Sequence, residues 1–129
     1  MPEGVGSSGA GRGIVREVAR RLAVGGAKVV VTDLDGDVLN ETTALLGGQA
    51  LAIAGDITDA ALPDQLVKAA MGELGGLDII VNNAGYTWDN VIQKTTDEQF
   101  QAMLDIHVVA PFRVLRAASE VIRSRAKAE

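Results

Sequence analysis

Short apolar runs alternate along the chain with longer segments in which apolar residues recur at helical spacing. The runs cover residues 27–32, 49–54 and 77–81, and their Val, Ile, Leu and Ala content is typical of strands buried on both faces. Helical spacing is clearest over residues 14–22, before the first run. Strands that alternate with helices predict a parallel, doubly wound α/β sheet between two helical layers. We expect one such domain, spanning residues 1–129.

Glycine pairs and capping residues mark the expected helix ends. The pairs end three predicted helices, at Gly25–Gly26, Gly47–Gly48 and Gly75–Gly76. The second helix starts at the turn 35–37, and Thr58 or Asp59 caps the third. A capping-box pattern at Thr96 and Gln99 predicts that a long terminal helix begins there.

Composition narrows the possible functions. The formal charge is -5 and the basic residues are scattered, which argues against a nucleic-acid partner. The sequence has no cysteine, so it has no disulfide framework or thiolate metal site, and we expect no metal centre. It also lacks a signal-peptide pattern and any run of about 18 uncharged apolar residues. We therefore expect a cytoplasmic protein with no membrane partner.

The stretch Asn82-Asn83-Ala84-Gly85 directly follows the predicted strand 77–81. In open α/β sheets, ligands bind beyond the carboxyl ends of the strands, where small residues let the backbone come close. This position predicts that the stretch faces a bound nucleotide.

The glycine-rich opening carries a second nucleotide signal. Gly4-Val5-Gly6-Ser7-Ser8-Gly9 fits the phosphate-binding pattern G-x-G-x-x-G, although such a segment is also typical of a flexible tail. Asp33 follows Gly9 by 24 positions, close to the spacing at which an acidic residue bonds the adenosine ribose. The alternative role of Asp33 is to start a turn. Its carboxylate would repel a 2′-phosphate, which favours NAD over NADP.

Together these segments resemble the N-terminal half of a short-chain dehydrogenase/reductase of the 3-oxoacyl-carrier-protein reductase type, from about Gly6 to Lys127. Gly9-Ala10-Gly11-Arg12 resembles the end of the family's T-G-x-x-x-G-x-G loop, and residues 82–85 match its N-N-A-G motif. Asp33 resembles the family's NAD-selecting acid, and Asp56 resembles the aspartate that contacts the adenine.

The resemblance implies a Rossmann-like fold and an NAD(P)-dependent oxidoreductase acting on a hydroxyl, a ketone or an acyl thioester. This chain would be its cofactor-binding half. The implied cofactor residues are Gly6, Ser8, Gly9 and Gly11 at the pyrophosphate, Asp33 at the ribose, Asp56 with its neighbour Ile57 at the adenine, and Asn83, Ala84 and Gly85 on the nicotinamide side.

The opening departs from the family pattern in two ways. Val5 occupies the place of the first loop glycine, so either Gly4 or Gly6 substitutes for it or the loop is shifted. The family also has an apolar strand before this loop, whereas only three residues precede Gly4 here. We therefore expect the first strand to be absent, which would leave the neighbouring strand edges unpaired.

The family's catalytic Ser and Tyr-x-x-x-Lys lie beyond the terminal helix, so we expect the C-terminal half of the fold to be absent. Tyr86 is the sole tyrosine and has no lysine four residues later. His107 stands where the family's fourth catalytic residue is normally Asn, although a lone histidine on an apolar stripe is also typical of a core residue. Pro111 has no N–H, so in a continuous helix the His107 carbonyl is free to hold a water, as in the family's proton relay.

The predicted terminal helix carries an apolar face, made of Val114, Leu115, Ala118, Val121 and Ile122. This face packs on the sheet or forms a homo-oligomer contact, as the equivalent helix does in relatives. A second class of function stays open beside the oxidoreductase: a non-catalytic nucleotide-binding or dimerisation module, or an inactive truncated product.

Overall fold

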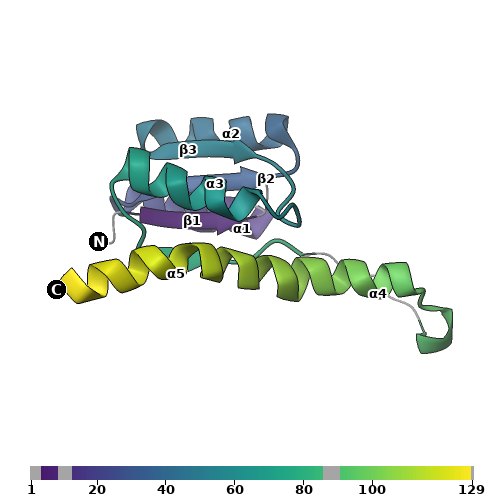
Figure 1. The fold of residues 1–129 in the computed structure, drawn as a ribbon. Coiled ribbons are helices and arrows are strands. Elements are labelled where there is room, and N and C mark those ends of the chain that lie inside the picture. The colour runs from purple at the N-terminus through teal and green to yellow at the C-terminus, as the bar shows by residue number, and fades with distance from the viewer. Residues whose placement is uncertain (1–3, 9–12, 86–90, 129) are drawn as a thin grey trace.

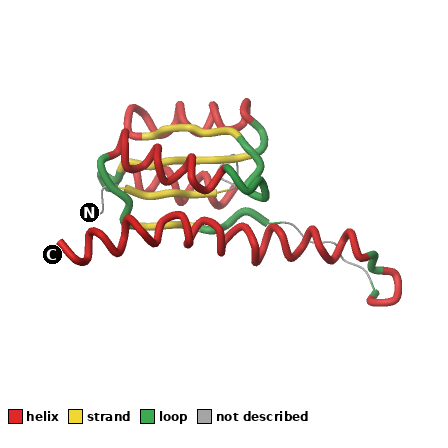
Figure 2. Tube along the Cα trace, viewed as in Figure 1, coloured by secondary structure: helices red, strands yellow, loops and turns green. Residues whose placement is uncertain are grey.

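The computed structural model describes residues 4–8, 13–85 and 91–128. Its centre is a four-stranded parallel sheet of order β3-β2-β1-β4 (Figures 1 and 2). The strands are β1 (Gly4–Ser8), β2 (Lys28–Asp33), β3 (Ala50–Ala54) and β4 (Ile79–Val81). The α-helices are α1 (Gly13–Val24), α2 (Gly36–Leu46), α3 (Leu62–Ala69), α4 (Asp97–Leu104) and α5 (Ala110–Ala128).

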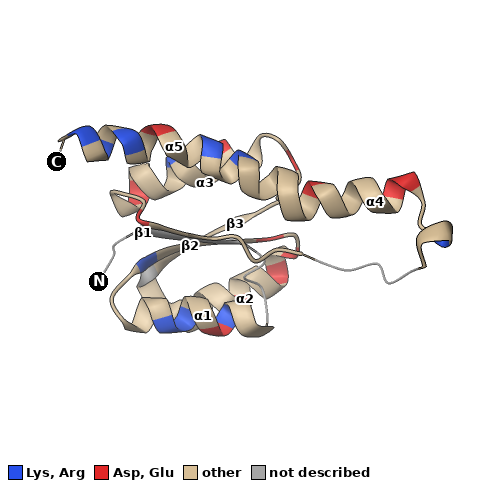
Figure 3. Ribbon diagram, turned by 90° about the horizontal axis from the view of Figure 1, so that it is seen from below, with Lys and Arg blue, Asp and Glu red and all other residues tan. Residues whose placement is uncertain are grey.

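Helices cover both faces of the sheet, which confirms the predicted three-layer α/β/α class. Figure 3 shows α1 and α2 on one face and α3 and α5 on the other, while α4 extends past the sheet. Because successive strand residues point to opposite faces, Val29 and Val31 of β2 pack with α1 and α2, and Val30 packs with α3 and α5. All three valines are almost completely buried, so β2 lies at the centre of both cores.

The glycine-rich opening forms a strand. β1 pairs in parallel with β2 from Gly4↔Lys28 to Ser8↔Thr32, and with β4 from Val5↔Ile79 to Ser7↔Val81. The predicted absence of a first strand is therefore wrong. Glycine and serine are poor strand formers, but a backbone ladder on each side satisfies the N–H and C=O groups of β1 whatever its side chains.

The segment between β3 and α3 also differs from the prediction. Asp56 accepts a hydrogen bond from the Thr58 amide at 2.9 Å, and Asp59 accepts one from the Ala61 amide at 3.0 Å. These side chains fold the segment into turns, so α3 begins at Leu62 and neither Thr58 nor Asp59 caps it. Aspartate favours such local turns over helix, so the helix begins later than the sequence pattern predicts.

Two helix starts follow their capping residues. Asp35 caps α2 by accepting from the amides of Asp37 and Val38 at 3.1 and 3.2 Å. The predicted capping box of α4 is confirmed, because Thr96 accepts from the Gln99 amide at 3.1 Å and the Gln99 side chain accepts from the Thr96 amide at 3.2 Å.

A π-helical segment, Asp105–Val109, joins α4 to α5 and ends two residues before Pro111. In it the Ala110 amide bonds the Asp105 carbonyl, five residues earlier. Proline is a common cause of such distortions because it cannot donate a helix hydrogen bond. The prediction about the His107 carbonyl assumed α-helical spacing, which this segment does not follow. Among the described residues, no helix has the length and apolarity that a membrane crossing requires.

Candidate functional site

A groove of about 710 Å³ opens at the carboxyl ends of β2, β3 and β4, beside the N-terminal end of α1. Parallel strands present their carboxyl ends at one edge, and a doubly wound sheet binds ligands there. The groove brings together six of the residues that the sequence singled out: Asp33, Asp56, Ile57, Asn83, Ala84 and Gly85. Gly6 and Ser8 lie in β1, while Gly9 and Gly11 fall outside the described residues.

Asp33 ends β2, and its hydrogen bonds connect two walls of the groove. Its Oδ1 accepts from the Asp35 amide at 3.1 Å, and its main-chain oxygen accepts from the Gly55 amide at 3.0 Å. The first bond shapes the turn into α2, and the second holds the end of β3 against the end of β2. Asp33 therefore has the turn role proposed as an alternative, and its half-buried carboxylate also lines the groove.

Asp56 ends the next wall of the groove. Its Oδ1 accepts from both the amide and the hydroxyl of Thr58, at 2.9 and 2.6 Å. Its side chain is exposed, whereas the neighbouring Ile57 is buried. The chain thus turns between Asp56 and Ile57, so that a carboxylate faces the groove edge while an apolar side chain anchors the segment.

His107 lies against Gly85, at the end of the N-N-A-G stretch. A Cβ built on Gly85 would come within 2.6 Å of Cε1 of His107. His107 is exposed, so its interpretation as a core residue is wrong. The stripe expected around it turns outward as well, because Phe100 and Val108 are 59% and 57% exposed. The π-helical segment thereby directs the imidazole toward the loop after β4.

Thr32 is a groove residue that the sequence interpretation missed. Its side chain is 2% exposed, and no group in the described part of the chain bonds its Oγ1. An unsatisfied buried hydroxyl costs about 1–3 kcal/mol. Thr32 lines the groove, so this hydroxyl is buried beside the space that a ligand would occupy. The available signal was a hydroxyl at the end of an apolar strand, directly before Asp33.

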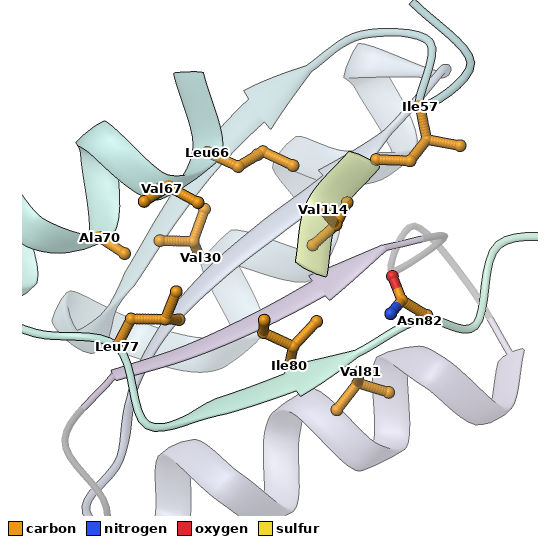
Figure 4. Close-up of a pocket in the computed structure, with 10 residues that line it drawn as sticks. All are labelled: Val30, Ile57, Leu66, Val67, Ala70, Leu77, Ile80, Val81, Asn82 and Val114. Atoms are coloured by element: carbon orange, nitrogen blue, oxygen red, sulfur yellow. The ribbon is translucent and has the colours of Figure 1, made fainter. Parts of the chain in front are cut away.

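Asn82 faces a different space. It lines an apolar cavity of about 30 Å³ between the sheet, α3 and α5, whose other lining residues include Val30, Ile80 and Val114 (Figure 4). That volume is about the share of one water molecule in the liquid, too small for a nucleotide. Asn82 is itself exposed, so it lies at the rim of this cavity, and residues 83–85 line the groove.

The strand order and the groove at the carboxyl ends define a doubly wound α/β protein with the topology of dinucleotide-binding domains. The chain belongs to the short chain dehydrogenase family, which it matches over residues 7–129.

The match extends to individual relatives. Hydroxyacyl-CoA dehydrogenase ChsB1 of Mycobacterium tuberculosis is 42% identical over 93% of this chain and 40% of its own length. The 3-ketoacyl-(acyl-carrier-protein) reductase from Brucella melitensis, solved in complex with NADH, is 32% identical with a TM-score of 0.91, over 98% of this chain and 53% of that one. A metagenomic short-chain oxidoreductase solved with NADP is 27% identical with a TM-score of 0.88, over 95% of this chain and 57% of that one. The chain spans about half the length of the curated relatives it matches.

Proposed function

We propose that residues 1–129 form one domain that binds a nicotinamide dinucleotide in this groove, with NAD preferred over NADP. The observation that carries the proposal is the convergence of Asp33, Asp56 and residues 83–85 on a single groove at the carboxyl ends of parallel strands.

Each group of proposed residues would contact a different part of the cofactor. Asp33 would receive the adenosine ribose, Asp56 with Ile57 the adenine, and Asn83, Ala84 and Gly85 the nicotinamide side. The pyrophosphate would lie near Gly6, Ser8, Gly9 and Gly11, between β1 and the N-terminal end of α1. Solved relatives carry NADH in one case and NADP in another, so the preference for NAD rests on the negative charge of Asp33.

The proposed activity is hydride transfer between the cofactor and a hydroxyl or ketone, including acyl thioesters. The names of ChsB1 and of the Brucella reductase support this substrate class. The bound dinucleotide would supply the hydride chemistry. His107 is the candidate for a catalytic role, because it lies against Gly85 on the proposed nicotinamide side. The sequence holds no Tyr-x-x-x-Lys, so we propose cofactor binding, and not turnover, as the function of this chain alone.

A fluorescence titration tests the proposal. Trp88 is the sole tryptophan and lies three positions after Gly85, outside the described residues. Added NADH should quench Trp88 or receive energy from it, and NADPH should do so only at higher concentration. A chain whose circular dichroism is folded but which shows no response to either nucleotide contradicts the proposal.

A dimerisation module is the second candidate, and one observation favours it. The apolar face of α5 splits into a buried side with Val114 and Ala118 and an exposed side with Phe112, Leu115 and Ile122, which are 56%, 54% and 47% exposed. The exposed three are spaced to lie along one stripe of the helix. We propose that this stripe forms a homo-oligomer contact, in a cytoplasmic protein.

Sedimentation velocity tests this contact. Leu115→Glu should convert a dimer to monomer, because it places a charge in the middle of the stripe. Leu45→Glu on α2 is the matched control, since Leu45 is 60% exposed and lies on the other face of the sheet. A monomeric unmodified chain, or an equal effect of both substitutions, argues against the stripe as the contact.

A further inference from the structure

Arg113 connects α5 to the segment that forms the adenine side of the proposed site. Its side chain is half-buried, and its Nη1 donates to the main-chain oxygen of Thr58 at 3.1 Å. Thr58 lines the groove, whereas Arg113 approaches from the helix behind it. The contact joins two elements far apart in sequence, which a solvated surface arginine would not do.

Thr58 is held from the other side by Asp56. The Asp56 Oδ1 accepts both the amide and the hydroxyl of Thr58, at 2.9 and 2.6 Å. The amide and carbonyl of one residue therefore bond in opposite directions, to Asp56 and to Arg113. The Thr58 carbonyl belongs to the peptide that joins Thr58 to Asp59, and the N–H of this peptide donates to the Asp56 main-chain oxygen at 2.9 Å. Losing Arg113 therefore removes one of the two hydrogen bonds on this peptide, which loosens the turn that holds Thr58 and, through Thr58, the Asp56 carboxylate.

Ile57 anchors the same segment independently. It is 8% exposed and packs in an apolar cluster with Ile106, Ala110 and Val114. Removing the guanidinium leaves this cluster intact, so the fold should survive the loss of Arg113. What the loss removes is the polar contact that ties the Thr58 carbonyl to α5.

We infer that Arg113 is a positioning residue for the nucleotide: through Thr58 it fixes the carboxylate of Asp56 at the adenine end of the groove. The inference rests on the proposed function, because it assigns the adenine to that end. A guanidinium suits the task, since its planar donors hold a direction that a lysine ammonium on a flexible stem does not. Arg113→Lys should therefore not restore full affinity.

The test compares Arg113→Met with Arg123→Met, which removes the same charge from an exposed position on the same helix. Binding of NADH and of reduced nicotinamide mononucleotide, which lacks the adenosine, is measured for each chain. Arg113→Met should weaken NADH roughly 3- to 10-fold, the effect of one lost hydrogen bond. It should leave the mononucleotide unchanged, and Arg123→Met should change neither. In an Asp56→Ala background, Arg113→Met should add less than about twofold, because the two residues act as a unit.

Equal weakening of both nucleotides, or full additivity with Asp56→Ala, overturns the inference. Amide hydrogen exchange at Thr58 is a second measurement, which needs no ligand. The exchange should be faster in Arg113→Met than in Arg123→Met. Unchanged exchange also overturns the inference. An unmodified chain that binds no NADH overturns the proposed function instead, and the exchange result then decides whether Arg113 fixes the segment.

Discussion

The imidazole of His107 packs so closely on Gly85 that it occupies the space that a side chain at position 85 would need. The distance from an added Cβ on Gly85 to Cε1 of His107 would be 2.6 Å, and to Nδ1 3.3 Å. The two residues come from different elements, the loop after β4 and the π-helical segment before α5. Their contact places the imidazole against the wall of the groove that the loop after β4 forms.

Gly85→Ala should displace the imidazole and leave the fold intact. His107 is exposed, so its ring can rotate away at a cost of about 1 kcal/mol or less. Because His107 is the sole histidine in the sequence, its imidazole NMR signals report the movement directly. Gly76→Ala is the control, since an added Cβ there would meet nothing within 4 Å. Identical imidazole signals in Gly85→Ala and the unmodified chain would contradict the contact.

Asp33→Asn should change the choice of nucleotide. The substitution keeps an oxygen that can accept from the Asp35 amide but removes the charge that would oppose a 2′-phosphate. The ratio of NADPH affinity to NADH affinity should rise roughly 5- to 10-fold, from Coulomb interactions at short range in a wet groove. Parallel titrations with the two nucleotides measure it. Asp37→Asn, on the first turn of α2, is the matched control, and a ratio that moves equally in both variants argues against Asp33 as the selector.

Thr42→Val should destabilise the contact between α1 and α2. Thr42 is completely buried, and its Oγ1 accepts from Arg16 Nε at 2.7 Å. Valine has nearly the same shape but leaves that donor without its acceptor, at a cost of about 1–3 kcal/mol in unfolding free energy. Urea unfolding measures the loss. Thr43→Val is the control because the Thr43 hydroxyl bonds only within its own helix, to the Leu39 carbonyl at 2.8 Å; equal losses in both variants would refute the interhelical role.

Stability should depend on Glu17 in acid. Hydrogen bonds from Arg20 and Arg21 lower the pKa of Glu17 from 4.5 to about 2. Because the folded-state pKa is the lower one, this contribution is present above pH 4.5 and is lost as the pH falls toward 2. Glu17→Gln should therefore lower the melting temperature at pH 6 but not at pH 2. The difference should shrink in high salt because the cluster is exposed. Glu73→Gln serves as the control. A difference in melting temperature between Glu17→Gln and the unmodified chain that stays the same across this pH range would contradict the arginine pairing.

The features that could be predicted from the sequence are those set by local chemistry. Thr96 and Gln99 bond each other across one turn, so four consecutive residues are enough to predict their capping box. Asp33 and Asp56 meet at one groove because each ends a parallel strand, and parallel strands place their ends together. Both inferences need only short-range pattern and sheet geometry.

The features that were missed depend on partners far along the chain. β1 looks like a loop from its own residues and becomes a strand because β2 and β4 bond both of its edges. The spacing predicts His107 on an apolar stripe, but in the structure it lies exposed in the π-helical segment, with its imidazole against Gly85. The only sequence signal of Thr32 is a hydroxyl at the end of an apolar strand, and it is the packed structure that leaves this hydroxyl without a partner among the described residues.

The strand order has a consequence for how the protein is made. β1 precedes the other described strands in the chain, yet one of its two neighbours, β4, is synthesised only after β2, β3 and the helices between them. Until Ile79 emerges to pair with Val5, β1 is an edge strand of the nascent sheet, open to solvent and to other chains. Such non-local pairing also slows folding. Pairing of β4 therefore covers β1 and makes β4 the new edge strand.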